Sequence, residues 1–126
     1  MPRRSTALAN LGAGPPIELP IGREVQFSVG EMLANYFNAA QYYSPREDID
    51  VILVKGRRRI WAFEVKQGGF TQREAIDAVA KMRRVAERVG LVSLSEKPPE
   101  VGDLSIGPPG ELLNMAEELA RRNGVI

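Results

Sequence analysis

The sequence predicts an α/β domain whose elements follow in the order α-β-β-β-α-β, with a further helix at the C-terminus. Apolar residues recur every three or four positions in residues 21–38 and 71–89, which is typical of helices. Residues 48–54 and 59–66 instead alternate in polarity around a short basic turn, as the strands of a hairpin do. An apolar run at 91–94 follows the second helix, and a strand after a crossover helix pairs in parallel. We therefore expect a mixed central sheet flanked by helices.

The chain divides into one domain and an N-terminal arm. Its 126 residues suit a single hydrophobic core, which we assign to residues 21–126. Residues 1–20 contain Arg3, Arg4 and a Gly-Ala-Gly-Pro-Pro run, and this composition predicts a flexible basic arm. The arm is either an inert tail or a segment that contacts phosphates or a partner subunit.

The composition narrows the chemistry that the chain can perform. There is no cysteine, so disulfides and thiolate zinc sites are excluded. There is no histidine, so Ser-His-Asp and Cys-His catalysis and histidine metal sites are excluded as well. Catalysis would have to use carboxylates, lysine, arginine, hydroxyls and a metal ion. With 44% hydrophobic and 26% charged residues, the composition is that of an ordinary globular protein.

Two further features concern location and charge. No apolar run reaches the roughly 20 residues of a membrane span, and the N-terminus lacks the apolar core of a signal peptide. We therefore expect a cytoplasmic protein with no membrane partner. The net charge is only +1, but arginine predominates among the 17 basic residues, and arginine suits bidentate contact with phosphate.

The first predicted helix, residues 21–38, offers two polar candidates for a functional site. Gln26 lies on the inner border of the apolar stripe, whereas Glu31 lies nearly opposite it at about 100° per residue. Glu31 also follows Ser28 by three positions, which is the spacing of a capping box. We therefore favour Gln26, although a polar residue at a helix border explains this position equally well. The apolar stripe consists of Val25, Val29, Met32, Leu33, Tyr36 and Phe37.

The predicted hairpin brings acidic residues together. Alternation places Asp48 and Asp50 on one face of its first strand, and Glu64 and Lys66 on one face of its second. Successive residues on one face are about 6.6 Å apart along a strand. Pairing of the strands would therefore gather two or three carboxylates and one ammonium on an otherwise apolar surface. Such carboxylates repel one another and are costly to desolvate, so a compensating cation is expected.

A magnesium ion would compensate this charge. Mg²⁺ binds one or two carboxylates and completes its shell with water and substrate phosphate. Lys66 would then hold or polarise an attacking water, or offset charge on the phosphate. Trp61 and Phe63 alternate away from Glu64, so we expect them in the core beneath a helix rather than stacked on bases.

Asp50, followed after a hairpin by Glu64-Val65-Lys66, resembles the PD-(D/E)xK nuclease superfamily, which has the restriction-endonuclease-like fold. Within that superfamily the likeness is to archaeal Holliday junction resolvases and to the nuclease-like domain of some archaeal P-loop ATPases. The likeness covers residues 22–106. One departure is Ile49, which stands where the family motif has proline.

The resemblance implies a Mg²⁺- or Mn²⁺-dependent DNA endonuclease that acts as a homodimer on branched DNA and takes no small-molecule substrate. It implies that Asp50 and Glu64 bind the metal, that Lys66 readies the water, and that Gln26 is the contribution of the first helix. The products would carry 5′-phosphate and 3′-hydroxyl ends. The remaining candidates around the metal are the Val65 carbonyl, Asp48 and Gln67.

Two other interpretations remain open. The same fold could belong to a catalytically inactive nucleic-acid-binding or regulatory domain, which would fit an uncharged Gln26 on the first helix. Alternatively, Asp50, Glu64 and Lys66 form a salt-bridge network without a metal, since two strands can bring such residues together by chance.

Basic residues gather at two further places. The turn at 55–59 is either a solvated tip that deters edge aggregation or a contact for phosphate. The second helix carries a set of charged residues that is either a basic stripe along a DNA backbone or a solvated face with pairs such as Arg83 and Glu87. That set is Arg73, Asp77, Lys81, Arg84 and Arg88. The candidates for DNA binding are Lys55, Arg57, Arg58, Arg73, Lys81 and Arg84.

The remaining boundaries follow from capping and turn residues. Thr71 and Glu74 have the spacing of a capping box at the start of the second helix, and Gly90 is expected to end that helix. Short strands are expected at 41–44 and 103–106, and a last helix at 110–123.

Overall fold

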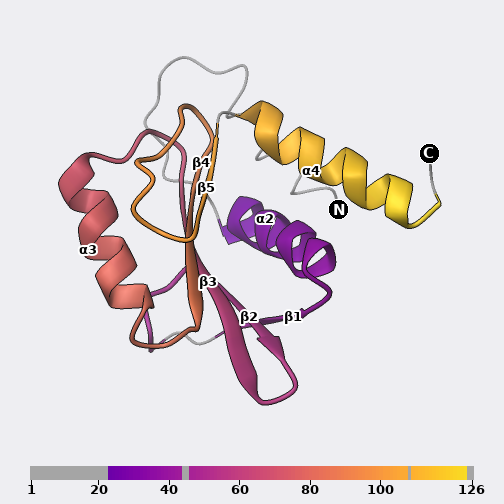
Figure 1. The fold of residues 1–126 in the computed structure, drawn as a ribbon, viewed down its shortest axis with the longest axis horizontal. Helices are drawn as coiled ribbons and strands as arrows, with labels where there is room; N and C mark the ends of the chain where they lie inside the picture. Colours follow the sequence, from indigo (N-terminus) through magenta and orange to yellow (C-terminus); the bar gives the residue numbers. More distant parts are fainter. Residues whose placement is uncertain (1–22, 44–45, 108, 125–126) are drawn as a thin grey trace.

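The computed structural model describes residues 23–43, 46–107 and 109–124, and the predicted arm at 1–20 lies outside them. Within this part of the chain, three helices and a five-stranded mixed sheet form an α/β fold, as the sequence predicts (Figure 1). The helices are α2 (Arg23–Tyr36), α3 (Gln72–Met82) and α4 (Pro109–Arg122). The strands are β1 (Ala40–Tyr42), β2 (Val51–Lys55), β3 (Arg58–Lys66), β4 (Arg88–Ser93) and β5 (Leu104–Ile106). No helix in the described ranges is long and apolar enough to cross a membrane.

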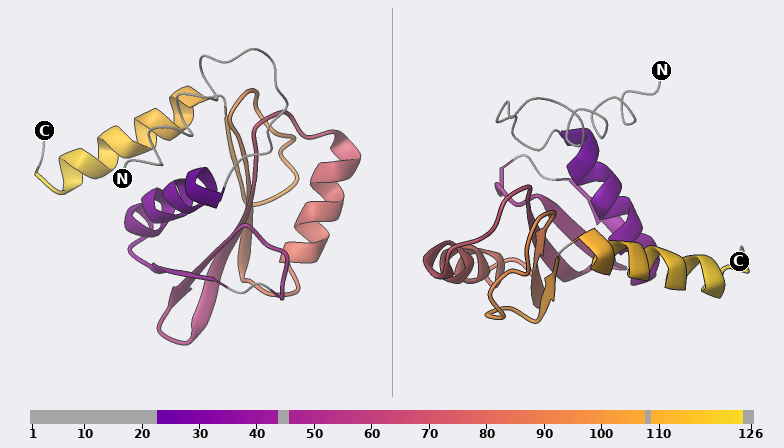
Figure 2. Two further views of the ribbon diagram at one scale, coloured as in Figure 1. Left: turned by 180° about the vertical axis from the view of Figure 1, so that it is seen from behind. Right: turned by 90° about the horizontal axis from the view of Figure 1, so that it is seen from above.

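The sheet has the strand order β1-β2-β3-β4-β5 and changes direction at its central strand, β3. β1, β2 and β3 pair antiparallel, whereas β3, β4 and β5 pair parallel. Helix α3 covers one face of the sheet, and α2 and α4 lie on the other (Figure 2). Because α3 connects two parallel strands, it is the crossover helix that the sequence pattern predicts.

Alternation along β3 divides the core between the two faces. Trp61, Phe63 and Val65 pack in the cluster that includes α2, whereas Ala62 packs in the cluster beneath α3. The rings of Phe37, Trp61 and Phe63 stack, with centroids 4.9 Å apart for Phe37 and Trp61 and 5.1 Å apart for Trp61 and Phe63. The predicted burial of the two β3 aromatics is confirmed, and these rings fix the orientation of the strand.

The register of the hairpin brings Asp50 level with Glu64. Val51 pairs with Phe63, so the residue before Val51 stands opposite the residue after Phe63. The register irregularity of this hairpin follows Leu53, nearer to the turn. Alternation is therefore unbroken at the end of the strands where the acidic residues lie.

The second helix is shorter than predicted. It begins with the expected capping box of Thr71 and Glu74, but it ends at Met82. Gly90, which was expected to stop the helix, lies inside β4, where a Cβ would come within 2.4 Å of the Phe63 ring. Glycine is therefore required at this position by packing across the sheet, and the local sequence does not distinguish this role from that of a glycine that ends a helix.

Two local predictions are also wrong. β2 begins at Val51 rather than at residue 48, because Asp48 has a φ of 50° and lies in the turn before the strand. Asp48 therefore does not share a strand face with Asp50. Ser28 lies inside α2, where its hydroxyl donates to the Glu24 carbonyl at 2.8 Å, so it does not cap the helix.

We expect Gly90→Ala to destabilise the fold by about 1–3 kcal/mol, because the added methyl group would overlap the fully buried Phe63 ring. Equilibrium unfolding in urea measures the loss. Gly68→Ala is the matched control, since a Cβ there meets nothing within 4 Å, and it should stay within about 0.5 kcal/mol of the wild type. A Gly90→Ala variant as stable as the wild type would contradict the packing of Phe63 against β4.

Candidate functional site

Asp50 is held in place by contacts from a strand and from a helix. Its Oδ2 accepts a hydrogen bond from the backbone N–H of Val65 at 2.8 Å. Its Oδ1 accepts a hydrogen bond from Nε2 of Gln26 at 3.3 Å. Gln26 belongs to α2, so the structure brings the favoured helix residue to the carboxylate at the start of β2. These bonds fix the Asp50 carboxylate at the end of the hairpin, level with Glu64.

Glu64 approaches the same point from β3. Glu64 follows Ala62 by two residues, and residues two apart on a strand point to the same face. Its side chain therefore leaves the sheet on the face that α3 covers. The side chain is 23% exposed, and its Oε1 lies 3.5 Å from Nζ of Lys81. Asp50 and Glu64 therefore form a half-buried pair of carboxylates at the junction of β2, β3 and α3, with an ammonium beside them.

Burial and repulsion disfavour the ionised forms of both carboxyls. Desolvation is the largest effect on Asp50 and raises its pKa, as the charge of Asp48 also does, against the Val65 hydrogen bond and the charge of Lys81. Desolvation also raises the pKa of Glu64, the negative charge of Asp50 adds to that rise, and Lys81 opposes it. Two coupled carboxyls with raised pKa values are typical of functional sites, because their charge is retained at a cost in stability.

Lys66 shares the sheet face of Glu64, but its ammonium turns toward the start of α3. Its Nζ lies 2.9 Å from Oε2 of Glu74 and 5.0 Å from the centroid of the Phe70 ring. The other Glu74 oxygen accepts the backbone N–H of Thr71, as the capping box requires. The Thr71 N–H and the Lys66 ammonium lower the pKa of Glu74 to about 2. The predicted catalytic lysine is therefore next to the carboxylate pair in sequence and on its face, but its charge is paired elsewhere.

Lys81 is the ammonium that lies at the carboxylate pair. In addition to Glu64, it contacts Asp48, donating to the Asp48 carbonyl at 2.8 Å and lying 3.9 Å from its Oδ2. Sequence reasoning placed Lys81 on an outward basic stripe and missed this role. A signal was present, because Lys81 follows the buried Ala78 by three positions and precedes the buried Met82, which sets it at the border of the apolar face.

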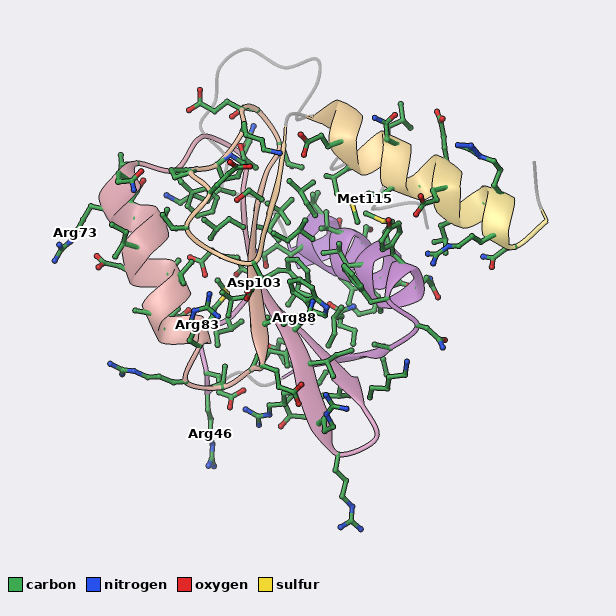
Figure 3. All side chains as sticks on the ribbon, viewed as in Figure 1. Arg46, Arg73, Arg83, Arg88, Asp103 and Met115 are labelled. Carbon is green, nitrogen blue, oxygen red and sulfur yellow. The ribbon has the colours of Figure 1, made fainter. Side chains whose placement is uncertain are left out.

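The predicted basic stripe on the second helix does not form. Arg88 lies on β4 and Arg84 lies beyond the end of α3, so neither continues a helical face. Arg73 projects from α3 away from the sheet and pairs with Asp77 at 3.5 Å (Figure 3). The expected pair of Arg83 with Glu87 is also wrong. Arg83 pairs with Asp103 and Glu87 with Arg58.

The remaining candidates lie near or beyond the edges of the site. Gln67 follows β3 in an exposed loop, and Lys55 and Arg57 are exposed at the hairpin turn. Arg58 donates to both oxygens of Glu87, through Nε at 2.8 Å and Nη2 at 2.6 Å. Asp48 has a side chain that is 99% exposed. Asp48 reaches the carboxylate pair only indirectly, through the Lys81 ammonium that also contacts Glu64.

The donor set suits a hard divalent cation that keeps most of its shell for water and phosphate. In the part of the chain that the structure describes, no three acidic, histidine or cysteine side chains gather in a group that could hold a metal ion. The available protein ligands are therefore the two carboxylates of Asp50 and Glu64. One or two carboxylates are what Mg²⁺ takes from a protein at phosphate-transfer sites. A cation at the pair would also offset the negative charge of Asp50, which raises the pKa of Glu64.

Comparison of the chain with protein-family models, with curated proteins and with solved structures gives no match. No family is therefore assigned on these grounds. The chemistry of Asp50, Glu64 and the neighbouring lysines is the basis for a functional proposal.

In the metal-free protein, Asp50 and Glu64 hold protons more tightly in the folded than in the unfolded state, because their folded pKa values are raised. Stability should therefore fall as the pH rises from the ordinary carboxyl pKa of about 4 through the raised values. Asp50→Asn removes one charge and retains an oxygen for the Val65 N–H, so we expect about 0.5–1 kcal/mol of added stability at neutral pH. Urea unfolding with a chelator, over a series of pH values, measures both effects.

Asp103→Asn is the control of opposite sign for this experiment. The Asp103 carboxylate accepts the Val89 N–H and pairs with Arg83, and these contacts lower its pKa. Its charge stabilises the fold above the ordinary pKa of a carboxyl, so its removal should lower stability at neutral pH. If Asp50→Asn lowered stability as Asp103→Asn does, the account of Asp50 as a costly charge would be wrong.

Proposed function

We propose that this chain is a Mg²⁺- or Mn²⁺-dependent DNA endonuclease with a restriction-endonuclease-like core of the PD-(D/E)xK type. The observation that carries the proposal is the carboxylate pair, in which Asp50, directly before β2, stands level with Glu64 of β3 and each has a raised pKa. The element order and the mixed sheet, with a hairpin followed by a crossover helix, support the same assignment. The resolvase-like motif favours branched DNA as the substrate and a homodimer as the active form.

In this proposal Asp50 and Glu64 hold the metal, with the Val65 carbonyl as a further candidate ligand. The bound cation would polarise a phosphodiester and lower the pKa of a coordinated water. Gln26 and the Val65 N–H orient the Asp50 carboxylate through its hydrogen bonds, so that its remaining lone pairs are directed by the protein before substrate arrives. Preorganised ligands of this kind are what a hydrolytic metal site requires.

Lys66 is the residue assigned to the attacking water. Its pair with Glu74 joins two side chains that are 33% and 48% exposed. Exposed ion pairs are worth about 0–1 kcal/mol, so a phosphate or a water at the metal could draw the ammonium away at little cost. The Glu74 carboxylate would keep its capping bond to the Thr71 N–H when Lys66 leaves.

DNA would approach over exposed basic residues of the hairpin and of the segment before it. Lys55 and Arg57 stand at the hairpin turn, and Arg46 projects outward from the segment before β2 (Figure 3). Phosphate contacts of this kind position a duplex without reading its sequence. Arg58 is less suited to this role because its guanidinium is already engaged by Glu87.

A second candidate is a catalytically inactive domain of the same fold that binds nucleic acid or regulates a partner. Two observations favour it. Lys66 is paired with Glu74 rather than with the carboxylates, and Gln26 brings no charge to Asp50. The site would then retain the geometry of a nuclease without the full set of catalytic charges.

Cleavage of supercoiled plasmid and of a four-way DNA junction in Mg²⁺ or Mn²⁺ tests the proposal. We expect Asp50→Asn, Glu64→Gln and Lys66→Ala each to lose about a hundredfold or more of the activity, because each removes a metal ligand or the group that readies water. Lys97→Ala is the matched control, since Lys97 pairs with Glu111 of α4 rather than with the carboxylate pair and should leave activity unchanged.

The pattern of results separates the two candidates. Cleavage that persists in all three site variants would exclude the catalytic assignment. Junction binding without cleavage by the wild type, unchanged by Asp50→Asn, would favour the inactive domain. Junction binding that falls with rising salt would locate the affinity in phosphate contacts.

A further inference from the structure

We propose that Lys81 is a built-in counter-cation of the site. Its ammonium pairs with the Glu64 carboxylate in the metal-free protein and competes with the divalent cation for that carboxylate. This inference rests on the metal site of the proposed function and concerns how that site is regulated. It assigns to Lys81 a role distinct from that of Lys66, which is the lysine of the sequence motif.

The contacts of Lys81 single it out from the other ion pairs of the protein. Its ammonium lies 3.5 Å from Glu64 Oε1 and 2.8 Å from the Asp48 carbonyl oxygen. These are one carboxylate and one carbonyl, both hard oxygen donors of the kind that a metal ion prefers. The Lys81 ammonium therefore pairs with Glu64, which is one of the two carboxylates assigned to the metal ion.

The electrostatics point to the same lysine. Lys81 lowers the pKa of both Asp50 and Glu64, against the desolvation that raises them. Lys66 pairs instead with Glu74, with its Nζ 2.9 Å from the Glu74 Oε2. In the metal-free protein, Lys81 is thus the cation that offsets the repulsion between the two carboxylates.

A divalent cation bound to Glu64 would repel this ammonium at close range. The structure provides an alternative position for it. The Asp48 carboxylate is 99% exposed, lies 3.9 Å from Nζ of Lys81, and belongs to the residue whose carbonyl already accepts from that ammonium. Lys81 can therefore turn from Glu64 to the Asp48 carboxylate while it keeps the carbonyl hydrogen bond, which would hold it beside the metal once displaced.

Titration with Mn²⁺ at constant neutral pH, followed by electron paramagnetic resonance of the free ion, tests the inference without reference to cleavage. We expect Lys81→Met to bind Mn²⁺ about tenfold more tightly than the wild type, because the competing ammonium is removed. This change corresponds to about 1.4 kcal/mol of binding free energy. Methionine keeps much of the aliphatic part of the Lys81 side chain and removes its charge. Lys81→Arg retains the charge and should bind as the wild type does. Lys97→Met removes a lysine from a surface pair with Glu111 and is the matched control, expected to leave Mn²⁺ affinity unchanged.

Thermal unfolding gives a second readout that does not depend on the titration. In a chelator, Lys81→Met should unfold at a lower temperature than the wild type, because the half-buried Glu64 loses its cation. Saturating Mn²⁺ should then raise the unfolding temperature of Lys81→Met by more than it raises that of the wild type.

The outcomes separate this inference from the proposed function. Mn²⁺ affinity that is equal or weaker in Lys81→Met would overturn the competition, even if the wild type cleaves DNA. Tighter binding in Lys81→Met, lost again with Asp50→Asn, would support it even if no DNA is cleaved. Absence of Mn²⁺ binding in both the wild type and Lys81→Met would overturn the inference together with the metal site.

Discussion

The cost of holding two carboxylates together at a half-buried position is the constraint on which the rest of this structure depends. Asp50, directly before β2, stands level with Glu64 of β3, and its negative charge raises the pKa of Glu64. The protein offsets the two charges in part with the Val65 N–H, the Gln26 amide and the Lys81 ammonium. None of these neutralises the pair fully, because the pKa values of both carboxyls remain raised. A site whose negative charges are only partly compensated is suited to bind a cation.

The fold supplies the rigidity that this arrangement requires. β3 is the central strand and the point at which the sheet changes from antiparallel to parallel, so it is paired on both sides. The stacked rings of Phe37, Trp61 and Phe63 hold one of its faces against α2. The opposite face presents Glu64 toward α3, whose capping box also binds Lys66 through Glu74. Gln26, Glu64 and Lys81 are therefore carried by elements that pack in the core, and hydrogen bonds from Gln26 and Val65 hold Asp50 just before β2.

Sequence patterns were sufficient for those parts of the fold that short-range periodicity determines. The alternation in β3 predicted the burial of Trp61 and Phe63. The α/β architecture followed from the order of segments with helical and with strand-like spacing of apolar residues. The end of α3 was not predictable in this way. Apolar spacing continues past Met82, and Gly90 has the position of a helix stop, but its role is to admit the Phe63 ring from a neighbouring strand. That contact joins residues 27 positions apart, and it arises only once the sheet has formed.

The two lysines show the same limit at the level of the site. A motif defines Lys66 by its distance along the chain from Glu64, but the ammonium of a lysine lies at the end of a long flexible stem. Where the charge comes to rest depends on the partners within reach, and the capping glutamate of α3 is within reach of Lys66. Lys81 reaches Glu64 from the next helix because the crossover sets α3 over that face of β3. The spacing of the motif therefore specifies the positions of the carboxylates, whose side chains are short and held by the hairpin. It specifies the position of the neighbouring ammonium less firmly. For this reason the roles of the two lysines have to be argued from the folded arrangement, in which Lys66 pairs with Glu74 and Lys81 lies beside Glu64.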